Sequence, residues 1–366
     1  MKPILVINSG SSSLKYQVID TDGELSLLSG AIERVSDHGS ALREMAAHLE
    51  DSGIEPVAVA HRVVHGGERF SAPVVVTPDV EEEIEELVPL APLHNPGNLA
   101  GIRAARQLFP KLVQVAVFDT AFHQSMPEAS YRYAIDREVA DKFQIRRYGF
   151  HGSSHSYVTR KAASHLGIEP TEFNAISLHL GNGASVCAVR GGKSFETSMG
   201  LTPLEGLVMG TRSGDIDPAI VFYLMREGGM SAAEVDELLN KRSGMLGLTG
   251  LSDFRDIANA ADSGDRAAQL ALEIFTERVR QYIGGYLARL GRVDAIIFTA
   301  GVGEHSAPIR ASVCADLGHL GIELDESANK AATGLTDVAK KGSKIRILVV
   351  PTNEELEIAL GAAGLI

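Results

Sequence analysis

The sequence predicts an α/β protein built from two similar halves. Three observations carry this prediction. Short β-type runs alternate with amphipathic helical segments along the whole chain. A strand–glycine turn–strand unit occurs twice, once around Gly10 and once around Gly183. The 366 residues also exceed the length at which a single hydrophobic core usually stops growing.

The first unit is predicted to be a β-hairpin. The run ILVI (4–7) is wholly apolar, which is typical of a central strand buried on both faces. After the glycine turn, residues 14–19 alternate apolar and polar side chains, as a half-buried strand does. The phosphate-binding pattern GxxxxGK[ST] requires its lysine to open a helix, and the residues after Lys15 have strand periodicity. A nucleotide loop of that kind is therefore excluded.

The second unit predicts another hairpin. The apolar runs 175–180 and 184–189 flank Asn182-Gly183, the strongest short-range hairpin signal. We interpret the two units as duplicated halves, one in each domain.

Helix signals fill the intervals between the strands. Thr77 is a predicted N-cap before Pro78, Asn95-Pro96 opens a second helix, and the longest helical pattern spans roughly 267–290. Gly284 and Gly285 interrupt this pattern, where another helix or subunit could approach. The apolar residues of the pattern are predicted to pack in the core: Leu270, Ile274, Phe275, Val279, Tyr282, Ile283, Tyr286, Leu287 and Leu290. The remaining predicted elements are a helix at 40–49, a strand–turn–helix unit at 294–310 with Ser306 as its cap, a strand at 345–350 and a closing helix from 354.

Composition narrows the function classes. The net charge of −13, from 34 basic and 47 acidic residues, gives no basic footprint for nucleic acid. No apolar run approaches the ~18 residues that a bilayer-spanning helix needs, and the N-terminus lacks the pattern of a secretory signal. Two cysteines, Cys187 and Cys314, argue against a disulfide framework and suit a reducing compartment. We therefore expect a cytoplasmic protein without nucleic-acid or membrane partners.

Polar side chains gather at the first hairpin. On an extended strand Ser11, Ser13 and Lys15 lie two residues apart, so they share one face. Asn8 ends the preceding strand, and Gly10 allows the backbone to approach a ligand closely. This set suits a polyphosphate with its metal ion. The alternative is a plain polar hairpin exposed to solvent.

At this point the sequence resembles the acetokinase family, within the superfamily of actin-like proteins, sugar kinases and heat-shock ATPases. The resemblance runs from Val6 to Glu355 and rests on ten motifs in the family's order: NSGSSSLKY, AHRVVHGGERF, APLHNPGNL, VFDTAFHQSMP, YGFHGSSH, HLGNGASV, TPLEGLVMGTRSGDIDPA, DFRD, FTAGVGEHS and PTNEELEIA. It implies a duplicated actin-like, ribonuclease H-like fold of mixed β-sheets flanked by helices. ATP and magnesium are expected in the cleft between the two domains, and the protein is expected to be a homodimer. By the same resemblance, residues 1–122 plus 354–366 form the domain with the phosphate hairpin and the acyl substrate. Residues 123–353 form the domain for nucleotide binding and dimerisation.

Two arginines are candidates for holding anions. Arg62 follows an apolar, strand-like run, where an arginine needs a partner; a buried structural ion pair is one alternative. By resemblance it contacts the substrate carboxylate. Arg212 lies in a glycine-rich loop and could instead pair with Asp215 or Asp217. The family's matching arginine stabilises the phosphoryl group in transfer.

Two further residues, Asp119 and His151, complete the predicted catalytic set. Asp119 ends an apolar strand, a usual place for a functional carboxylate in an α/β sheet, although it could merely cap Ala121 or Phe122. The family gives it a catalytic role; because acetate, with a pKa near ~4, is already ionised at neutral pH, we favour orienting magnesium or its waters over proton transfer. By resemblance His151 stabilises the transition state, whereas we expect His155 to be structural. Their spacing lacks the HExxH pattern of a zinc site.

The resemblance also implies the nucleotide and metal residues. Those assigned to ATP or ADP are Ser11, Ser13, Lys15, His179, Leu180, Gly181, Asn182, Gly183, Asp253, Phe254, Arg255, Gly301, Val302, Gly303, Glu304 and His305, with a helix N-terminus expected after a glycine loop at 301–304. Asn8 and Glu354 are assigned to Mg²⁺, with Mn²⁺ as an alternative, because magnesium takes oxygen ligands. Alone, Thr352 to Glu355 would be a capping box at the closing helix. His305 departs from the asparagine common in the family, which leaves the nucleoside contact there open.

The expected reaction is reversible, direct phosphoryl transfer from ATP to acetate, giving acetyl phosphate and ADP. The expected acyl-pocket residues are Val64, Leu93, Phe150 and Pro203. Propionate kinase is the nearest rival, because one or two methylenes change binding by only about 1–3 kcal/mol. A non-catalytic ATPase switch is a second rival, but it leaves Arg62 and Arg212 without a role.

Overall fold

The computed structural model describes residues 2–10, 13–35 and 37–366. Ser11, one of the predicted ATP-binding residues, lies outside this part of the chain. By its internal contacts the chain forms two compact units. Unit 1 comprises Met1–Gln124, Phe150–Tyr157 and Asn353–Ile366, and unit 2 comprises Ser125–Gly149 and Val158–Thr352. The functional division predicted at 122 and 353 stays a prediction, and the segment Phe150–Tyr157 groups with unit 1.

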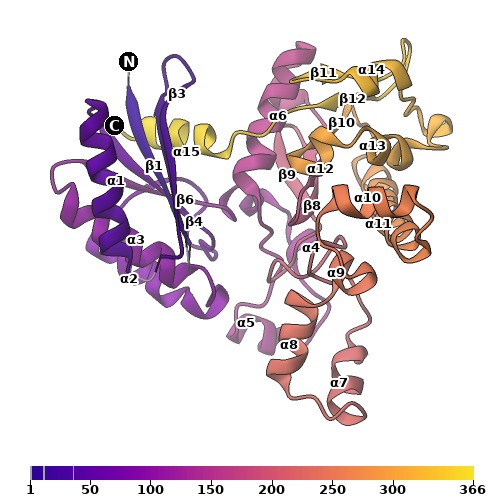
Figure 1. Ribbon diagram of the computed structural model, residues 1–366, viewed down its shortest axis with the longest axis horizontal. Helices are drawn as coiled ribbons and strands as arrows, with labels where there is room; N and C mark the ends of the chain where they lie inside the picture. Colours follow the sequence, from indigo (N-terminus) through magenta and orange to yellow (C-terminus); the bar gives the residue numbers. More distant parts are fainter. Residues whose placement is uncertain (1, 11–12, 36) are drawn as a thin grey trace. The chain divides into compact units, whose positions relative to one another are not determined.

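Each unit contains one mixed six-stranded sheet flanked by helices (Figure 1). The two sheets have the same topology. The strands of unit 1 are β1 (Pro3–Ser9), β2 (Ser13–Asp20), β3 (Leu25–Glu33), β4 (Ala58–Val63), β5 (Val74–Val75) and β6 (Val113–Phe118), in the order β3-β2-β1-β4-β6-β5. Those of unit 2 are β7 (Ala175–Leu180), β8 (Ala184–Arg190), β9 (Lys193–Thr197), β10 (Ala295–Thr299), β11 (Thr336–Asp337) and β12 (Arg346–Val349), in the order β9-β8-β7-β10-β12-β11. In both sheets the three central strands are parallel and the outer pairings are antiparallel. The predicted duplication is therefore present in strand order, direction and chain order.

Helices surround both sheets. The α-helices are α1 (His38–Ser52), α2 (Pro78–Glu86), α3 (Asn95–Leu108), α4 (Glu128–Tyr131), α5 (Arg137–Lys142), α6 (Gly152–Leu166), α7 (Ala219–Arg226), α8 (Ala232–Lys241), α9 (Gly244–Thr249), α10 (Phe254–Asp262), α11 (Arg266–Leu290), α12 (Ala300–His305), α13 (Ala307–Cys314), α14 (Glu326–Ala331) and α15 (Glu354–Ala363). Four short 3₁₀ turns are η1 (Val88–Leu90), η2 (Ala121–Ser125), η3 (Pro170–Glu172) and η4 (Gly318–Leu320).

Both predicted hairpins are confirmed. In the first, Asn8 pairs with Lys15 and the amide of Gly10 donates to the carbonyl of Ser13 at 2.8 Å. The predicted alternation holds in β2, where Tyr16 is buried and Lys15 is exposed. In the second, the strands close at Leu180 opposite Ala184. No helix follows Lys15, as its periodicity predicts.

The core of unit 1 lies on both faces of its sheet. Alternate residues of β1 and β2 pack with α1 and α3 on one face, because the side chains of a strand alternate. α15 packs against β1, β4 and β6, and Glu355 in its first turn lines a cavity together with Val6 and Asn8. The closing helix therefore covers the second face, on which Asn8 and Lys15 lie.

In unit 2 the long helix α11 packs against β7 and β8, and α13 packs against α11. The predicted core assignment holds for residues such as Phe275, Val279 and Ile283, which are fully buried. It is wrong for Leu270, which is 43% exposed near the first turn of the helix. Gly284 and Gly285 leave open space around them, because a β-carbon at either position would meet no atom within 4 Å beyond the neighbouring helix backbone.

Two local predictions are wrong. The segment 301–304 is not a glycine loop, because α12 starts at Ala300 directly after β10; the side chain of Glu304 accepts from the amide of Ala300 at 2.9 Å and so satisfies that helix end. The cap of α15 is Asn353 rather than Thr352, since its side chain accepts from the amide of Leu356 at 3.0 Å. Asparagine satisfies the same free amide that a threonine would.

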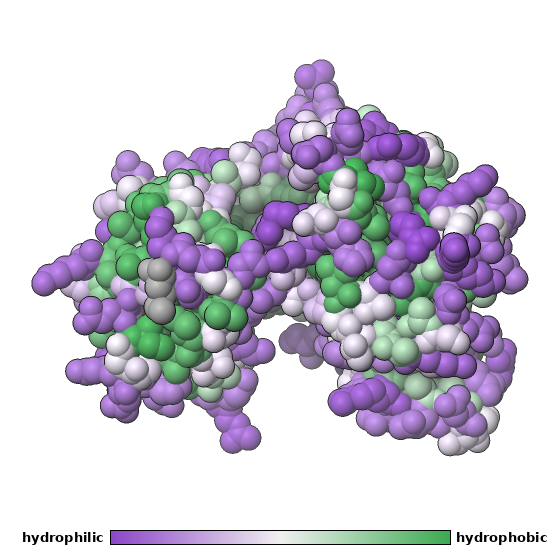
Figure 2. Space-filling model, turned by 90° about the horizontal axis from the view of Figure 1, so that it is seen from above, coloured by the Kyte–Doolittle hydropathy of each residue, from purple (hydrophilic) through white to green (hydrophobic). Residues whose placement is uncertain are grey.

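No helix among the described residues is long and apolar enough to cross a membrane. The molecular face in Figure 2 is dominated by hydrophilic residues, with hydrophobic residues exposed in separate areas.

Candidate active site

Arg62 lies near the end of β4 and is held by two neighbours from adjacent strand ends. Its Nε and Nη2 donate to the carboxylate of Asp119 at 2.9 and 2.5 Å, and its Nη1 donates to the side-chain oxygen of Asn8 at 3.3 Å. Strand β4 lies between β1 and β6 in the sheet, which brings Asn8 and Asp119 to either side of it. A guanidinium has five donors, so two remain without acceptors among the described residues.

Burial and charge act in opposite directions on this cluster. Burial favours the neutral form of Arg62, but the charges of Asp119 and Glu354 outweigh it and raise its pKa. Burial raises the pKa of Glu354 to about 7, although Arg62 acts against that shift. Asp119 itself is 1% exposed and bonded to Arg62. The capping role considered for it stays a prediction. The buried ion pair considered for Arg62 is present.

The same cluster can be judged as a magnesium site. No group of three or more His, Cys, Asp and Glu side chains in the described ranges is arranged to hold a metal. That agrees with the small number of protein ligands that Mg²⁺ takes when substrate phosphates supply the rest. The amide oxygen of Asn8 and the carboxylate of Glu354 are hard oxygen donors, and the raised pKa of Glu354 marks a charge that a cation would stabilise. The donor set therefore fits the ion.

His151 is positioned by the backbone next to Asp119. It adopts the left-handed conformation, with φ of 57°, immediately before α6. The amide of Gly152 then donates to the carbonyl of Asp119 at 2.9 Å, and a side chain at 152 would come within 2.2 Å of that oxygen. Glycine at 152 therefore allows this close approach. His155 is fully buried and makes an edge contact with the ring of His123, which agrees with a structural role.

Sequence reasoning gave no role to two asparagines that shape this site. Asn98 on α3 accepts from the amide of Val64 at 3.0 Å and donates to the carbonyl of Ser9 at 2.7 Å. Asn95 exchanges two hydrogen bonds with the backbone of His65. Both are buried, and they fix the chain after β1 and β4. The sequence signal that could have identified these two asparagines was their position in the motif APLHNPGNL.

Arg212 lies in a loop of unit 2 whose shape depends on glycine. Its Nη1 donates to the carbonyl of Pro203 at 2.8 Å, and no carboxylate in the described parts of the chain pairs with it. Burial lowers the pKa of Arg212. The pairing considered with Asp215 is wrong, because Asp215 accepts from Tyr282 at 2.8 Å and pairs with Arg278 at 3.1 Å.

The Arg212 loop is also attached to the second hairpin. The amide of Gly210 donates to the carbonyl of Asn182 at 2.9 Å. Gly244, with φ of 60°, starts α9 against this loop, where a side chain would lie 2.1 Å from the carbonyl oxygen of Met209. The loop that carries Arg212 is therefore hydrogen-bonded directly to the hairpin turn.

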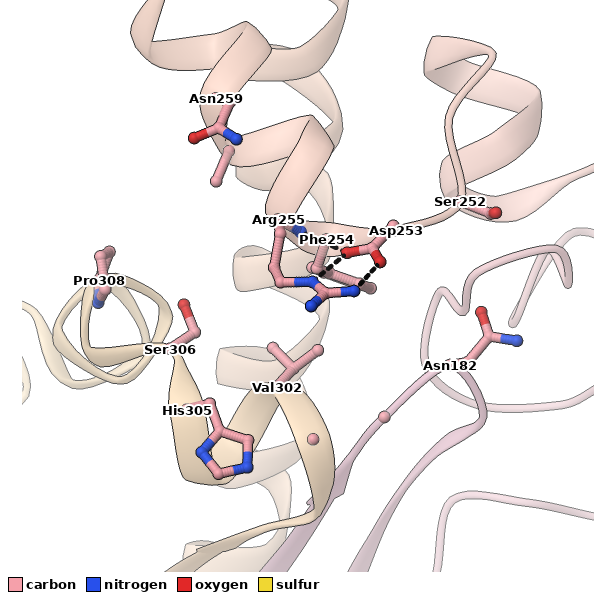
Figure 3. A pocket seen from close by; sticks show the side chains of 13 residues that line it. Asn182, Ser252, Asp253, Phe254, Arg255, Asn259, Val302, His305, Ser306 and Pro308 are labelled. Carbon is pink, nitrogen blue, oxygen red and sulfur yellow. Dashed lines mark hydrogen bonds and ion pairs between the residues drawn. The ribbon is translucent and has the colours of Figure 1, made fainter. Parts of the chain in front are cut away.

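A cavity of about 710 Å³ opens beside that turn in unit 2 (Figure 3). Among the lining residues, Arg255 donates to Asp253 through Nε and Nη2 at 3.0 and 2.6 Å. Val302 and His305 come from α12 on one side and Asn182 from the hairpin turn on another. The full lining is Gly181, Asn182, Ser252, Asp253, Phe254, Arg255, Ala258, Asn259, Gly301, Val302, His305, Ser306 and Pro308. Its size and mixed lining suit a nucleoside.

Three sequence segments predicted to bind the nucleotide thus line one cavity. Sequence reasoning missed Ser252, Ala258, Asn259, Ser306 and Pro308, which extend those segments by one turn. His179 and Leu180 are buried in β7 just before the cavity. Gly303 lies against β7 and β10, and the carboxylate of Glu304 accepts from the amides of Ala300 and Thr352; neither residue lines the cavity. Of the predicted acyl-pocket residues, Val64 and Phe150 are buried and Leu93 is 64% exposed, while Pro203 holds Arg212 through its carbonyl.

Comparison with known proteins decides the family. The model of the acetokinase family matches residues 31–360. The chain belongs to the acetokinase family. This confirms the resemblance seen in the ten motifs.

Curated members of the acetokinase family match the chain over nearly its whole length. The acetate kinase of Leifsonia xyli is 54% identical over 387 aligned residues, which cover 98% of each chain. The acetate kinase of Streptomyces coelicolor is 52% identical and covers 99% of this chain and 97% of its own.

Solved structures of family members have the same fold. The crystal structure of Porphyromonas gingivalis acetate kinase is 41% identical, covers 100% of both chains and gives a TM-score of 0.96. The crystal structure of a propionate kinase from Francisella tularensis is 42% identical, covers 99% of both chains and gives a TM-score of 0.94. The predicted fold of mixed sheets flanked by helices is confirmed.

Proposed function

We propose that this acetokinase family member catalyses reversible phosphoryl transfer between ATP and acetate. A carboxylate oxygen of acetate forms the new bond to the γ-phosphorus, and the bond from that phosphorus to the β–γ bridging oxygen breaks. ADP keeps the electron pair of the broken bond. The observation that carries the proposal is Arg62, a fixed guanidinium with two unused donors, in a chain about half identical to acetate kinases.

Arg62 binds and orients the acceptor. Asp119 occupies one edge of the guanidinium, and the two unused donors suit the two oxygens of a carboxylate. Because Asp119 accepts both bonds and is almost fully buried, its role is to orient Arg62 rather than to move a proton. Acetate needs no general base, since it is ionised at neutral pH.

Arg212 and His151 stabilise the phosphoryl group in transfer. Arg212 has no carboxylate partner in the described residues, so its charge is available to an anion. His151 is held next to Asp119 by the start of α6. Donors fixed before the reaction stabilise developing charge without reorganising, which is the main requirement of phosphoryl transfer.

Asn8 and Glu354 would hold Mg²⁺, or Mn²⁺ in its place. The ion supplies charge neutralisation at the phosphate oxygens when it is bound. Lys15 and Ser13 at the first hairpin would hold phosphate oxygens, and the cavity beside Asn182 would hold the nucleoside.

A hydroxamate assay across carboxylates tests the proposal. The purified protein should form acyl hydroxamate with ATP, Mg²⁺ and acetate, and pyrophosphate should not replace ATP because the 710 Å³ cavity fits a nucleoside. No product with any carboxylate would contradict the proposal. Calorimetric titration with acetate addresses the rival ATPase switch, which should bind nucleotide but no acetate.

Propionate kinase is the second candidate, favoured by the similarity to the Francisella tularensis structure. Val64 and Phe150 are buried close to the Arg62 strand end and would contact the acyl chain. The ratio of kcat/KM for propionate and acetate decides between the two, because one methylene is worth only about 1–3 kcal/mol.

We also propose that the protein is a homodimer and that α7 lies in its interface. No residue of α7 is buried, yet four of its apolar side chains are well exposed: Ile220 (41%), Phe222 (58%), Tyr223 (60%) and Met225 (38%). Contiguous exposed apolar patches on soluble proteins commonly mark interfaces. Phe222→Glu should therefore reduce the sedimentation coefficient of the protein. Phe143→Glu, at an equally exposed phenylalanine outside α7, should leave it unchanged. A monomeric wild type would contradict the proposal.

We place the protein in the cytoplasm, because its two cysteines are free and buried, as a reducing compartment allows.

A further inference from the structure

The largest fully buried side chain described is a charged one. Arg310 on α13 is 2% exposed, and all three of its nitrogen groups are bonded. Nε donates to the side-chain oxygen of Asn329 at 2.7 Å, and Nη2 donates to the backbone carbonyl of the same residue at 2.8 Å. Nη1 donates to the carbonyls of Gly303 and Glu304 at 2.9 and 2.8 Å. Within the described residues, no carboxylate pairs with this arginine.

These bonds complete the end of a short helix. The last carbonyls of a helix have no partner within it, and α12 has only six residues, so its end depends on outside donors. The guanidinium of Arg310 supplies two such bonds from one atom and places positive charge at the negative end of the helix. Lysine cannot reproduce this planar arrangement, because its ammonium is a single point.

The other end of α12 is fixed separately. The carboxylate of Glu304 accepts from the amide of Ala300 at 2.9 Å and from the amide of Thr352 at 3.0 Å. The side chain of Asn329 also donates to the carbonyl of Ala307 at 2.9 Å, which ties α14 to the start of α13. Three elements, α12, α13 and α14, are thereby held together around the guanidinium of Arg310.

The residues on the outer side of α12 line the nucleoside cavity. Gly301, Val302 and His305 belong to this lining, whereas Arg310 does not reach the cavity. Burying a cation without a counter-ion costs free energy unless hydrogen bonds satisfy its donors. The hydrogen bonds that satisfy Arg310 also fix α12, the helix that forms one wall of the cavity.

We propose that Arg310 is a positioning residue for the nucleotide: through the carbonyls of Gly303 and Glu304 it sets α12 against the nucleoside. The inference rests on the proposed nucleotide site in this cavity. The inference treats nucleotide binding and acetate binding as separate, because α12 lies in unit 2 whereas Arg62, which would hold the acceptor, lies in unit 1. Loosening α12 should weaken nucleotide binding and leave acetate binding almost unchanged.

The test uses the full-length protein and three substitutions of graded severity. Arg310→Lys keeps the charge and loses the planar donor set, Arg310→Met removes both, and Asn329→Ala keeps the arginine but frees its Nε. The matched control is Arg346→Lys, because Arg346 also binds backbone carbonyls and a side chain in unit 2 but does not touch α12. Calorimetry gives the dissociation constant of ADP, steady-state kinetics give the KM values of ATP and acetate, and hydrogen exchange reports on the amides of α12.

Arg310→Lys should weaken ADP binding and raise the KM of ATP about tenfold, with the KM of acetate changed less than twofold. Arg310→Met should weaken ADP binding more than Arg310→Lys does, and Asn329→Ala should weaken it less. In each variant the amide hydrogens of α12 should be the first to exchange faster. Arg346→Lys should change none of these values. Unchanged ADP affinity in a folded Arg310→Lys protein overturns the inference, as does an equal loss for ATP and acetate. If all three variants fail to fold, the Arg310 side chain serves folding alone, and the inference is also overturned. If the wild type binds no ADP, the proposed function itself fails.

Discussion

Arg62 and Asp119 form a two-bond ion pair, with Nε and Nη2 of the arginine 2.9 and 2.5 Å from the two carboxylate oxygens. The pair joins the end of β4 to the residue after β6. Nη1 also donates to Asn8, so two of the five guanidinium donors stay without an acceptor in the described residues. Such a fixed guanidinium is a ready binding site for a second, exchangeable carboxylate. One side chain could therefore hold Asp119 and, as we propose, the substrate carboxylate.

Replacing Arg62 by lysine should raise the KM of acetate about tenfold to a hundredfold. The ammonium keeps the charge but cannot bond Asp119 and a second carboxylate in one plane, and such charged hydrogen bonds contribute about 1.5–3 kcal/mol. Initial rates at saturating ATP measure the change. Arg103→Lys is the control, since Arg103 forms surface ion pairs with Glu81 and Glu85. Equal KM values in both variants would remove Arg62 from the acetate site.

Arg212→Ala and His151→Ala should chiefly lower kcat, by a factor on the order of 10²–10³, the usual effect of losing one donor to the transition state. Dissociation constants for acetate and ADP should stay within a few-fold. Arg266→Ala, at an exposed arginine paired with Glu273, serves as the control. If either variant kept full turnover and lost ADP affinity instead, its assigned role would be wrong.

Glu354→Gln should raise the Mg²⁺ concentration needed for half-maximal activity. The amide is a weaker ligand than a carboxylate and carries no charge to attract the ion. Activity measured against free Mg²⁺ checks this, and Mn²⁺ should show the same shift. Glu357→Gln, on the same helix and bonded to Ser156 at 2.6 Å, is the comparison. A Mg²⁺ requirement equal in wild type and Glu354→Gln would exclude Glu354 as a ligand.

His61 should make the protein less stable at acid pH. Burial lowers the pKa of His61 to about 4 from 6.5, against a hydrogen bond to Gln114 at 2.7 Å. Between pH 7 and 5 the unfolded chain therefore gains a proton that the folded chain does not, and stability falls as pH drops, by about 2 kcal/mol for this residue.

Urea unfolding of wild type and His61→Gln at pH 7 and pH 5 measures that contribution. Glutamine does not titrate and can still bond Gln114, so the difference between the two pH values should shrink by about 2 kcal/mol. An identical pH difference in the two proteins would show that His61 does not titrate as its burial implies.

Much of the fold could be predicted from local sequence. The alternation after Lys15, the Asn182-Gly183 turn and the caps at Thr77 and Ser306 each involve residues close in the chain, and the structure confirms them. The predictions that failed were also local. Asn353 replaced Thr352 as the cap of α15, and α12 replaced a glycine loop, because contacts with distant segments selected between equally good local choices.

The sequence by itself determined the family, the strand units and the chemical types of the site residues, since motif order and periodicity are properties of the chain. Only the tertiary structure decided which edge of Arg62 is occupied, that Asp215 belongs to Arg278 rather than Arg212, and that Arg310 binds the end of α12. Each of these pairings joins residues from different elements. Their partners depend on how strands and helices pack in three dimensions, and spacing along the chain carries no record of that packing.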